Sequence, residues 1–470
     1  MKNYLFKTKP IEDLLSEAAG KEGLKKVLGA FELTMLGIGA IIGTGIFVLT
    51  GVAAANYSGP ALVISFIISA LACCFAALCY AEFASMIPVA GSAYTYGYAA
   101  LGEIWGWIIG WDLILEYTVA IAAVAIGWSG YVVSLFKAGG IILPAALVNA
   151  PGVEGGMINL PAIGIIAVIT CLLIVGVKQT ANVNNIIVGI KLAVILLFIV
   201  LGVGHVHPSN WHPFMPYGWG GVLQGAAIIF FAYIGFDAVS TASEECKNPA
   251  KDMPKGIIGS LVICTILYII VSLILTGMVP YLQFKNTAAP VAYALQSVGI
   301  NWGAALVSVG ALCGITSVLL VMMFGQTRVF FAMSRDGLLP KVFGAVHPKY
   351  GTPAKSTVLV GVMTAIIAAW LPIGLVAELT NIGTLAAFII VSIAVIVLRK
   401  TRPDIKRSFK CPGSPFTPLL SVFFCGLLIY KLPHLTQIRF VVWLLIGFVV
   451  YFTYSYKHST MQIAERAKEK

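Results

Sequence analysis

The stretch GIGAIIGTGIFVLTG, residues 37–51, places five glycines and two threonines in a segment that is otherwise apolar. Glycine has no side chain to shield the backbone, so such a segment can bring its amides and carbonyls close to a ligand. Amides at the start of a helix favour an anion, and carbonyls at its end favour a cation. The chemistry expected here is recognition of charge by the main chain.

Three interpretations fit this stretch. The spacing of Gly39, Gly43 and Gly45 matches a variant of the glycine-rich dinucleotide loop, which requires a soluble α/β domain around it. Gly39 and Gly43 also form a GxxxG pattern, which lets two membrane helices pack closely. In the third interpretation, a membrane helix is broken and its freed backbone groups face a ligand.

The composition of the chain argues against a soluble domain. Apolar residues make up 59% of the 470 residues and charged residues only 10%, whereas soluble domains average about 45–50% and about 25%. The mean hydropathy is +0.95. We therefore expect an all-α integral membrane protein, and the dinucleotide loop is disfavoured.

Apolar runs of sufficient length predict 12 transmembrane helices, each of about 20 residues or more. Turn residues such as Ser58-Gly59-Pro60 separate the runs. The predicted spans are 31–55, 60–87, 96–134, 159–177, 184–205, 218–243, 256–280, 303–333, 356–372, 375–398, 415–433 and 438–456. The predicted units are an amphipathic N-terminal segment (1–30), spans 1–5 (31–205), spans 6–10 (218–398), spans 11–12 (415–456) and a tail (457–470).

The distribution of positive charge predicts the orientation. Of the 30 Lys and Arg residues, 25 lie in the two termini and in alternate loops, which places both termini in the cytoplasm of a multi-pass cell-membrane protein. The net charge of +11 is then explained by the membrane, and no nucleic acid partner is expected. No cleavable signal peptide is expected either. The nine cysteines form no CxxC pair, and no metal site is predicted.

A second interruption is expected in the sixth span. The stretch FFAYIGFDAVST, residues 230–241, places Gly235 and Asp237 at a depth similar to that of the first glycine-rich stretch. Breaks in spans 1 and 6 occupy matching positions if spans 1–5 and 6–10 are two inverted copies. A helix that begins at Thr44 or Gly45 favours a carboxylate, and the carbonyls that end FFAYI offer acceptors for an ammonium. Together these groups describe an α-amino acid.

Four further residues inside the spans carry polar or soft side chains. Lys191 lies about 10 Å from the cytoplasmic end of its span, where a lysine costs about 2.5–3.5 kcal/mol on insertion scales; it either has a function or snorkels to the surface. Glu116 either meets a cationic side chain or a proton in a cavity, or makes a structural hydrogen bond. Asp237 is expected to accept from freed amides. Met322 forms either a soft pocket wall or ordinary bundle packing.

The sequence resembles the amino acid, polyamine and organocation transporter superfamily, and within it a bacterial relative of the cationic amino acid transporters. The resemblance extends from about residue 30 to about residue 410. It is carried by the glycine-rich stretch and by AEFASMIPVAGSAYTY (81–96), FFAYIGFDAVSTASEECKNPAKDMPKGI (230–257), QTRVFFAMSRDGLLPKVF (326–343) and ELTNIGTLAAF (378–388).

The resemblance implies a five-plus-five inverted-repeat (LeuT-like) fold with spans 1 and 6 broken, two extra C-terminal helices and no metal. Gly39 and Gly235 would then be helix-break residues. The substrate carboxylate would meet Ile42, Gly43, Thr44 and Gly45. Carbonyls around Ile41, Phe231, Ala232 and Ile234 would receive the amino group, with Phe231 as a lid. Members of this family are also similar in having a lysine on the fifth span, which here is Lys191.

The expected function is secondary active transport of amino acids by alternating access, in the form of proton-coupled symport. We expect Lys191 to bind carbonyls near Gly39 to Ile42 and to couple proton movement to uptake, with the proton as coupling ion and no cofactor. Exchange without proton coupling is the alternative; a channel or receptor, or an enzyme, fits less well. The expected substrate range is either broad or limited to small neutral amino acids, cationic amino acids or both. We expect a monomer in the lipid bilayer. Whether a small accessory membrane peptide binds to it is not decided by the sequence.

Overall fold

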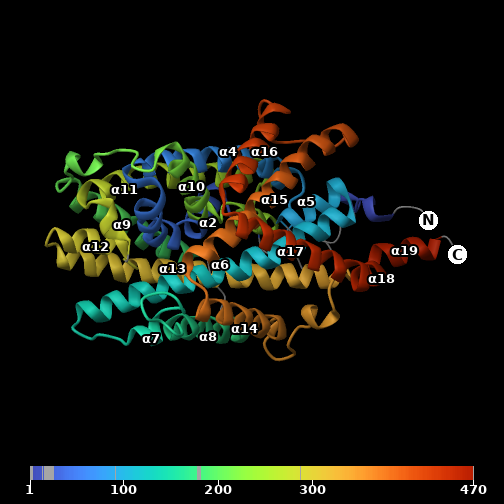
Figure 1. Ribbon diagram of the computed structural model, residues 1–470. Helices are drawn as coiled ribbons and strands as arrows, with labels where there is room; N and C mark the ends of the chain where they lie inside the picture. Colours follow the sequence, from blue (N-terminus) through green and yellow to red (C-terminus); the bar gives the residue numbers. More distant parts are fainter. Residues whose placement is uncertain are drawn as a thin grey trace.

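The computed structural model of the protein describes residues 4–12, 14, 26–89, 92–176, 181–285 and 287–468. Over these residues the chain forms helices and turns, with only two isolated bridges and no strand. The N- and C-termini lie at the same end of the molecule (Figure 1). Of the predicted amphipathic segment 1–30, residues 1–3, 13 and 15–25 lie outside the described residues.

The α-helices follow one another along the whole chain. They are α2 (Ala30–Ile41), α3 (Thr50–Ala53), α4 (Leu62–Met86), α5 (Ser92–Leu101), α6 (Glu103–Ala138), α7 (Ala145–Val148), α8 (Leu160–Val175), α9 (Ala181–Val203), α10 (Gly218–Ile229), α11 (Pro249–Met278), α12 (Pro290–Ser297), α13 (Asn301–Arg335), α14 (Ala354–Trp370), α15 (Ile373–Thr401), α16 (Phe416–Lys431), α17 (His434–Val450), α18 (Tyr456–His458) and α19 (Thr460–Lys468).

Short 3-10 or π-helical segments connect or extend them. They are η1 (Tyr4–Phe6), η2 (Gly45–Leu49), η3 (Ala54–Ser58), η4 (Gly59–Ala61), η5 (Pro208–Trp211), η6 (Phe230–Tyr233), η7 (Asp237–Glu245), η8 (Tyr281–Phe284), η9 (Lys341–Gly344) and η10 (Tyr451–Ser455).

Within the described residues, eight helical runs are long and apolar enough to cross a membrane, and α2, α8, α14 and α16 are shorter apolar helices. The run Gly45–Met86 joins parts of two predicted spans, and Gly59 turns the chain between them with φ 60°. The all-helical, membrane-spanning class is thus confirmed, whereas the number of 12 spans remains a prediction.

Long central helices form the core and shorter ones cover it. The pairs α4–α11, α6–α13 and α6–α15 lie against each other, while α8 packs on α14, and α16 packs on α4 and α15 (Figure 1). The covering helices expose large apolar side chains such as Val168, Val362, Phe423 and Leu445. An apolar outer surface of this kind suits contact with lipid, because burying it in hydrocarbon removes it from water.

The glycine-rich stretch both packs closely and breaks the helix. A Cβ at Gly39 would lie 2.8 Å from Val188 of α9, and one at Gly43 would lie 3.1 Å from Val318 of α13. A Cβ at Gly45 would overlap Ala232 of η6. Because these glycines face three different elements, they do not form the single GxxxG helix pair considered from the sequence.

Two helices stop where the sequence predicted interruptions. Helix α2 ends at Ile41, and Ile42 is extended with ψ 104° before η2 begins at Gly45. Helix α10 ends at Ile229 and tightens into η6, and Ile234 is extended with ψ 133°. Gly235 follows with φ 122°, a backbone conformation that residues other than glycine rarely adopt. Both interruptions lie among buried residues, so their freed backbone groups need partners from the protein, from water in a cavity or from a ligand.

Candidate functional site

The first interruption leaves polar groups that face the protein interior. The Ile42 amide donates to the Ile38 carbonyl at 2.9 Å, which closes the last turn of α2. The first amides of the following helix have no partner within that helix. The hydroxyl of Thr44 is buried and has no hydrogen-bond partner among the described residues. An unsatisfied hydroxyl beside a helix start is suited to a carboxylate.

The second interruption packs directly against the first. Gly45 approaches Ala232 so closely that any side chain at Gly45 would overlap it. A Cβ at Gly235 would lie 2.8 Å from the Ala40 carbonyl group at the end of α2. Asp237 accepts a hydrogen bond from the Gly235 amide at 3.3 Å, as the sequence led us to expect. The two breaks therefore form one continuous patch of main-chain groups.

Tyr268 joins the two breaks and was missed from the sequence. Its hydroxyl, on α11, lies 3.1 Å from the Ile41 carbonyl and 3.0 Å from the Ala232 carbonyl. The side chain is fully buried and its ring packs at 5.4 Å from those of Phe66 and Tyr233. A carbonyl has two lone pairs, so Ile41 and Ala232 retain acceptor capacity beside Tyr268. Nothing in the sequence singles it out, because the same apolar span also contains serine and threonine hydroxyls.

Asn381 completes the end of α10 and was also missed. Its side-chain amide donates to the Ala227 carbonyl at 2.7 Å and to the Ile228 carbonyl at 3.0 Å. These carbonyls lie where α10 gives way to η6, so their usual helical partners are displaced. Asn381 lies on α15 and is fully buried. It belongs to the stretch ELTNIGTLAAF, whose resemblance to the family gave no role to an individual residue.

Lys191 reaches the first break from α9. The side chain is 0% exposed, so it does not snorkel to the surface. Its Nζ donates to the Gly39 carbonyl at 2.5 Å, within the range of carbonyls expected. A Cβ at Gly314 of α13 would lie only 3.0 Å from the lysine stem. Among the described residues Lys191 forms no ion pair, so its ammonium is held by the main chain.

A cavity of about 790 Å³ leads to this region. Its lining includes Glu116, Ile234, Gly235, Asp237 and Met322 from the predicted set. At its other end it reaches the exposed residues Val27 and Tyr350. The lining does not include the other predicted binding residues, Ile41, Ile42, Gly43, Thr44, Gly45, Phe231 and Ala232, all of which are buried.

Two buried acidic side chains lie one turn apart on α6, and one of them lines the cavity. Glu116 lines the cavity and is 3% exposed, whereas Asp112, one turn away, is 1% exposed and has no hydrogen-bond partner among the described residues. A Cβ at Gly383 would lie 2.7 Å from Asp112, so α15 leaves room for this carboxyl. No group of three His, Cys, Asp or Glu side chains in the described part of the chain could hold a metal ion.

A bundle of apolar helices with a cavity that ends near two interrupted helices is the architecture of a membrane transport protein. The family model for amino acid permeases matches residues 28–460. The chain therefore belongs to the amino acid permease family, and the resemblance seen in the sequence is confirmed. It is a multi-pass membrane protein of a family of transporters, not enzymes.

Several curated relatives are similar over nearly the whole chain. The branched-chain amino acid permease BcaP of Bacillus subtilis (strain 168) is 56% identical over 464 residues, which cover 98% of this chain and 100% of the relative. The methylthioribose transporter of the same organism is 53% identical, with coverage of 97% and 99%. The vacuolar cationic amino acid transporter 4 of Arabidopsis thaliana is 39% identical, with coverage of 86% and 68%.

Replacing Asn381 by Asp tests whether its amide supports the second break. Asp has the same shape but presents oxygens to the Ala227 and Ile228 carbonyls, and each unpaired buried group costs about 1–3 kcal/mol. We expect the initial rate of amino acid uptake into proteoliposomes to fall about tenfold or more. Asn210→Asp is the matched control, because Asn210 donates to the Gly277 carbonyl at 2.7 Å away from the breaks. Normal uptake by Asn381→Asp would contradict this role.

Proposed function

We propose that the protein is a secondary active transporter of L-amino acids that works by alternating access and symports protons. The observation that carries the proposal is the contact between two helix breaks whose main-chain groups differ in character. Helix-start amides and the free hydroxyl of Thr44 lie on one side. Carbonyls of Ile41 and Ala232 lie close together on the other, since both reach the hydroxyl of Tyr268.

Each end of an α-amino acid has a partner in this arrangement. The carboxylate binds at Thr44 and Gly45, where helix-start amides favour negative charge. The ammonium binds the carbonyls of Ile41, Ala232 and Ile234. Recognition through groups common to all α-amino acids leaves the choice of side chain to the cavity wall. In this scheme Phe231 covers the bound substrate.

The cavity provides one of the two access routes that alternating access requires. It reaches Val27 and Tyr350, which lie in segments rich in Lys and Arg, so its mouth is on the cytoplasmic side. In this scheme the cavity opens to the cytoplasm and ends at Ile234 and Gly235, next to the buried groups of the proposed substrate site. We further propose 12 spans in two inverted sets of five plus two, with both termini in the cytoplasm and the protein in the cell membrane as a monomer.

The side-chain end of the cavity favours neutral, apolar amino acids. Ile234, Val318 and Met322 contribute apolar wall, which accommodates a branched side chain without an unpaired charge. The relative named a branched-chain amino acid permease fits this choice. Glu116 lines the same cavity and either binds a proton or admits a cationic side chain. Methylthioribose, named for another relative, has neither ammonium nor carboxylate and would leave both breaks without a charged partner.

Lys191 is the proposed coupling residue. Its bond to the Gly39 carbonyl fixes the end of α2, and loss of its proton would remove the charge that holds that carbonyl. Proton movement and the geometry of the first break are then linked through one contact. No sodium ion is needed in this scheme.

Transport assays in proteoliposomes test the proposed function. We expect uptake of radiolabelled leucine that saturates and shows counterflow, because a carrier moves its substrate through one site. Unlabelled isoleucine and valine should compete more strongly than arginine or methylthioribose. Uptake that neither saturates nor shows counterflow would indicate a channel and would contradict the proposal. Stronger competition by arginine would indicate that Glu116 binds the cationic side chain of the substrate.

Lys191→Ala tests proton coupling separately from substrate binding. In the unmodified protein an inward proton gradient should increase leucine accumulation, and in Lys191→Ala that increase should fall about tenfold or more, as expected for loss of a charged hydrogen bond. Lys285→Ala is the control, since Lys285 is exposed outside the spans. A variant that accumulates leucine with normal pH dependence would rule out coupling through Lys191. A proton gradient without effect on the unmodified protein would favour exchange.

A further inference from the structure

The end of α15 and the chain that follows it toward α16 concentrate basic residues beside the membrane. This segment, RKTRPDIKRSFK, residues 399–410, has six Lys or Arg residues and a single acid, Asp404. Clusters of this size directly next to a membrane helix attract anionic lipids. The contacts of the segment divide its basic residues into two groups with different roles.

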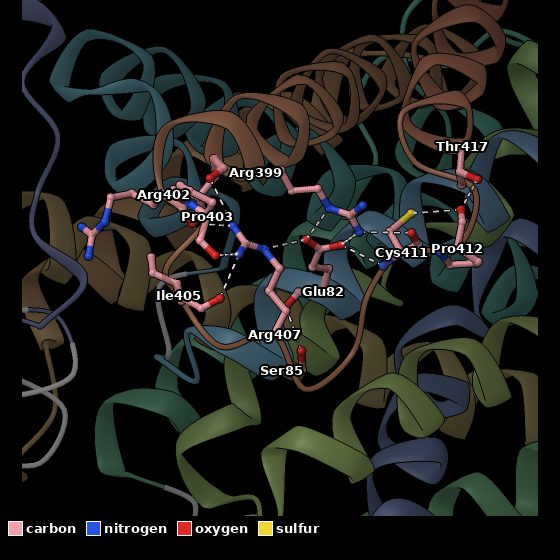
Figure 2. A network of polar contacts seen from close by, with 11 residues as sticks. Glu82, Ser85, Arg399, Arg402, Pro403, Ile405, Arg407, Cys411, Pro412 and Thr417 are labelled. Carbon is pink, nitrogen blue, oxygen red and sulfur yellow. Dashed lines mark hydrogen bonds and ion pairs between the residues drawn. The ribbon is translucent and has the colours of Figure 1, made fainter.

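One arginine pair is directed inwards onto a carboxylate of α4. Glu82 is 2% exposed, and Figure 2 shows Arg399 and Arg407 approaching it from opposite sides. The Arg399 Nε donates to Glu82 at 2.9 Å, the Arg407 Nε lies 3.4 Å from it, and the Cys411 amide donates to it at 2.7 Å. This buried carboxylate therefore fixes both ends of the segment to the helix bundle.

The remaining arginine contacts shape the turn between these ends. Arg407 donates to the carbonyls of Arg402 and Ile405, both at 2.8 Å. Arg402 pairs with Asp404 at 3.2 Å and with Glu12 of the N-terminal segment at 3.0 Å. Hydrogen bonds from Arg402 lower the pKa of Asp404 below its ordinary value, so Asp404 stays ionised and paired. The three arginines are thus matched by three carboxylates.

The three lysines of the segment are directed differently. Lys400, Lys406 and Lys410 are exposed, and they are in excess over the carboxylates that the arginines already engage. The apolar outer face of α16 begins six residues after Lys410, with Phe416 at 74% and Leu419 at 51% exposed. Three exposed lysines this close in sequence to the start of an apolar outer face are suited to contact lipid headgroups.

We propose that this segment is a binding site for anionic phospholipid headgroups of the cytoplasmic leaflet. Glu82 and the arginines hold the backbone in place, and Lys400, Lys406 and Lys410 contact the headgroup phosphates. The lysine ammonium is a compact charge suited to a mobile phosphate, whereas the arginines make fixed, directional contacts. The site is distinct from the cavity and does not depend on which substrate is transported.

Thermal unfolding of the full-length protein in neutral detergent tests the site, with phosphatidylglycerol, phosphatidylcholine and inorganic phosphate as the added probes. We expect phosphatidylglycerol to raise the unfolding temperature and the other two to have little effect. The triple variant Lys400→Gln, Lys406→Gln, Lys410→Gln should need at least about tenfold more phosphatidylglycerol for the same rise.

A second triple variant, Lys251→Gln, Lys255→Gln, Lys341→Gln, removes the same number of exposed lysines from other segments and should respond like the unmodified protein. The proposal is overturned if both triple variants lose the response equally, which would indicate general charge attraction. It is also overturned if the first variant retains the full response. If inorganic phosphate raises the unfolding temperature as much as phosphatidylglycerol does, the site binds a free anion and the lipid proposal is overturned.

Discussion

The main-chain groups freed at two helix breaks must find partners inside the protein, and the rest of the structure depends on this constraint. In hydrocarbon no water is available to bond an open amide or carbonyl. The structure meets this demand with side chains from three other helices. Tyr268 reaches Ile41 and Ala232, Asn381 reaches the end of α10, and Lys191 reaches Gly39. In the proposed function, groups that are still unsatisfied, such as the Thr44 hydroxyl, bind the substrate.

Helix α15 connects this constraint to the cytoplasmic end of the molecule. Asn381 bonds the end of α10, and the ring of Phe388 packs at 5.9 Å from Phe230 and 5.0 Å from Phe236, on the two sides of the second break. The last turn of the same helix carries Arg399, which is bound to Glu82 of α4 (Figure 2). A single rigid helix therefore supports the second break and anchors the basic segment.

Sequence reasoning located the breaks because they are local. Glycines and a carboxylate in apolar runs are visible without knowledge of the fold, and so is a lysine in mid-helix such as Lys191. Tyr268 and Asn381 could not be assigned in this way, since their roles arise only when α11 and α15 pack against the breaks. A cavity at Glu116 and a pocket wall at Met322 were among the interpretations of the sequence, but the course of the cavity was out of reach, because Val27 and Tyr350 at its other end are far apart in the chain and meet only in the folded protein.

Competition between leucine and analogues that lack one charged group tests the central claim most directly. The amine 3-methylbutylamine lacks the carboxylate, and 4-methylpentanoate lacks the ammonium. If both breaks bind the substrate through the main chain, each analogue should inhibit leucine uptake into proteoliposomes at least about a hundredfold more weakly than leucine itself, as expected for loss of a charged hydrogen bond of about 3 kcal/mol. Inhibition by either analogue as strong as that by leucine would contradict the account.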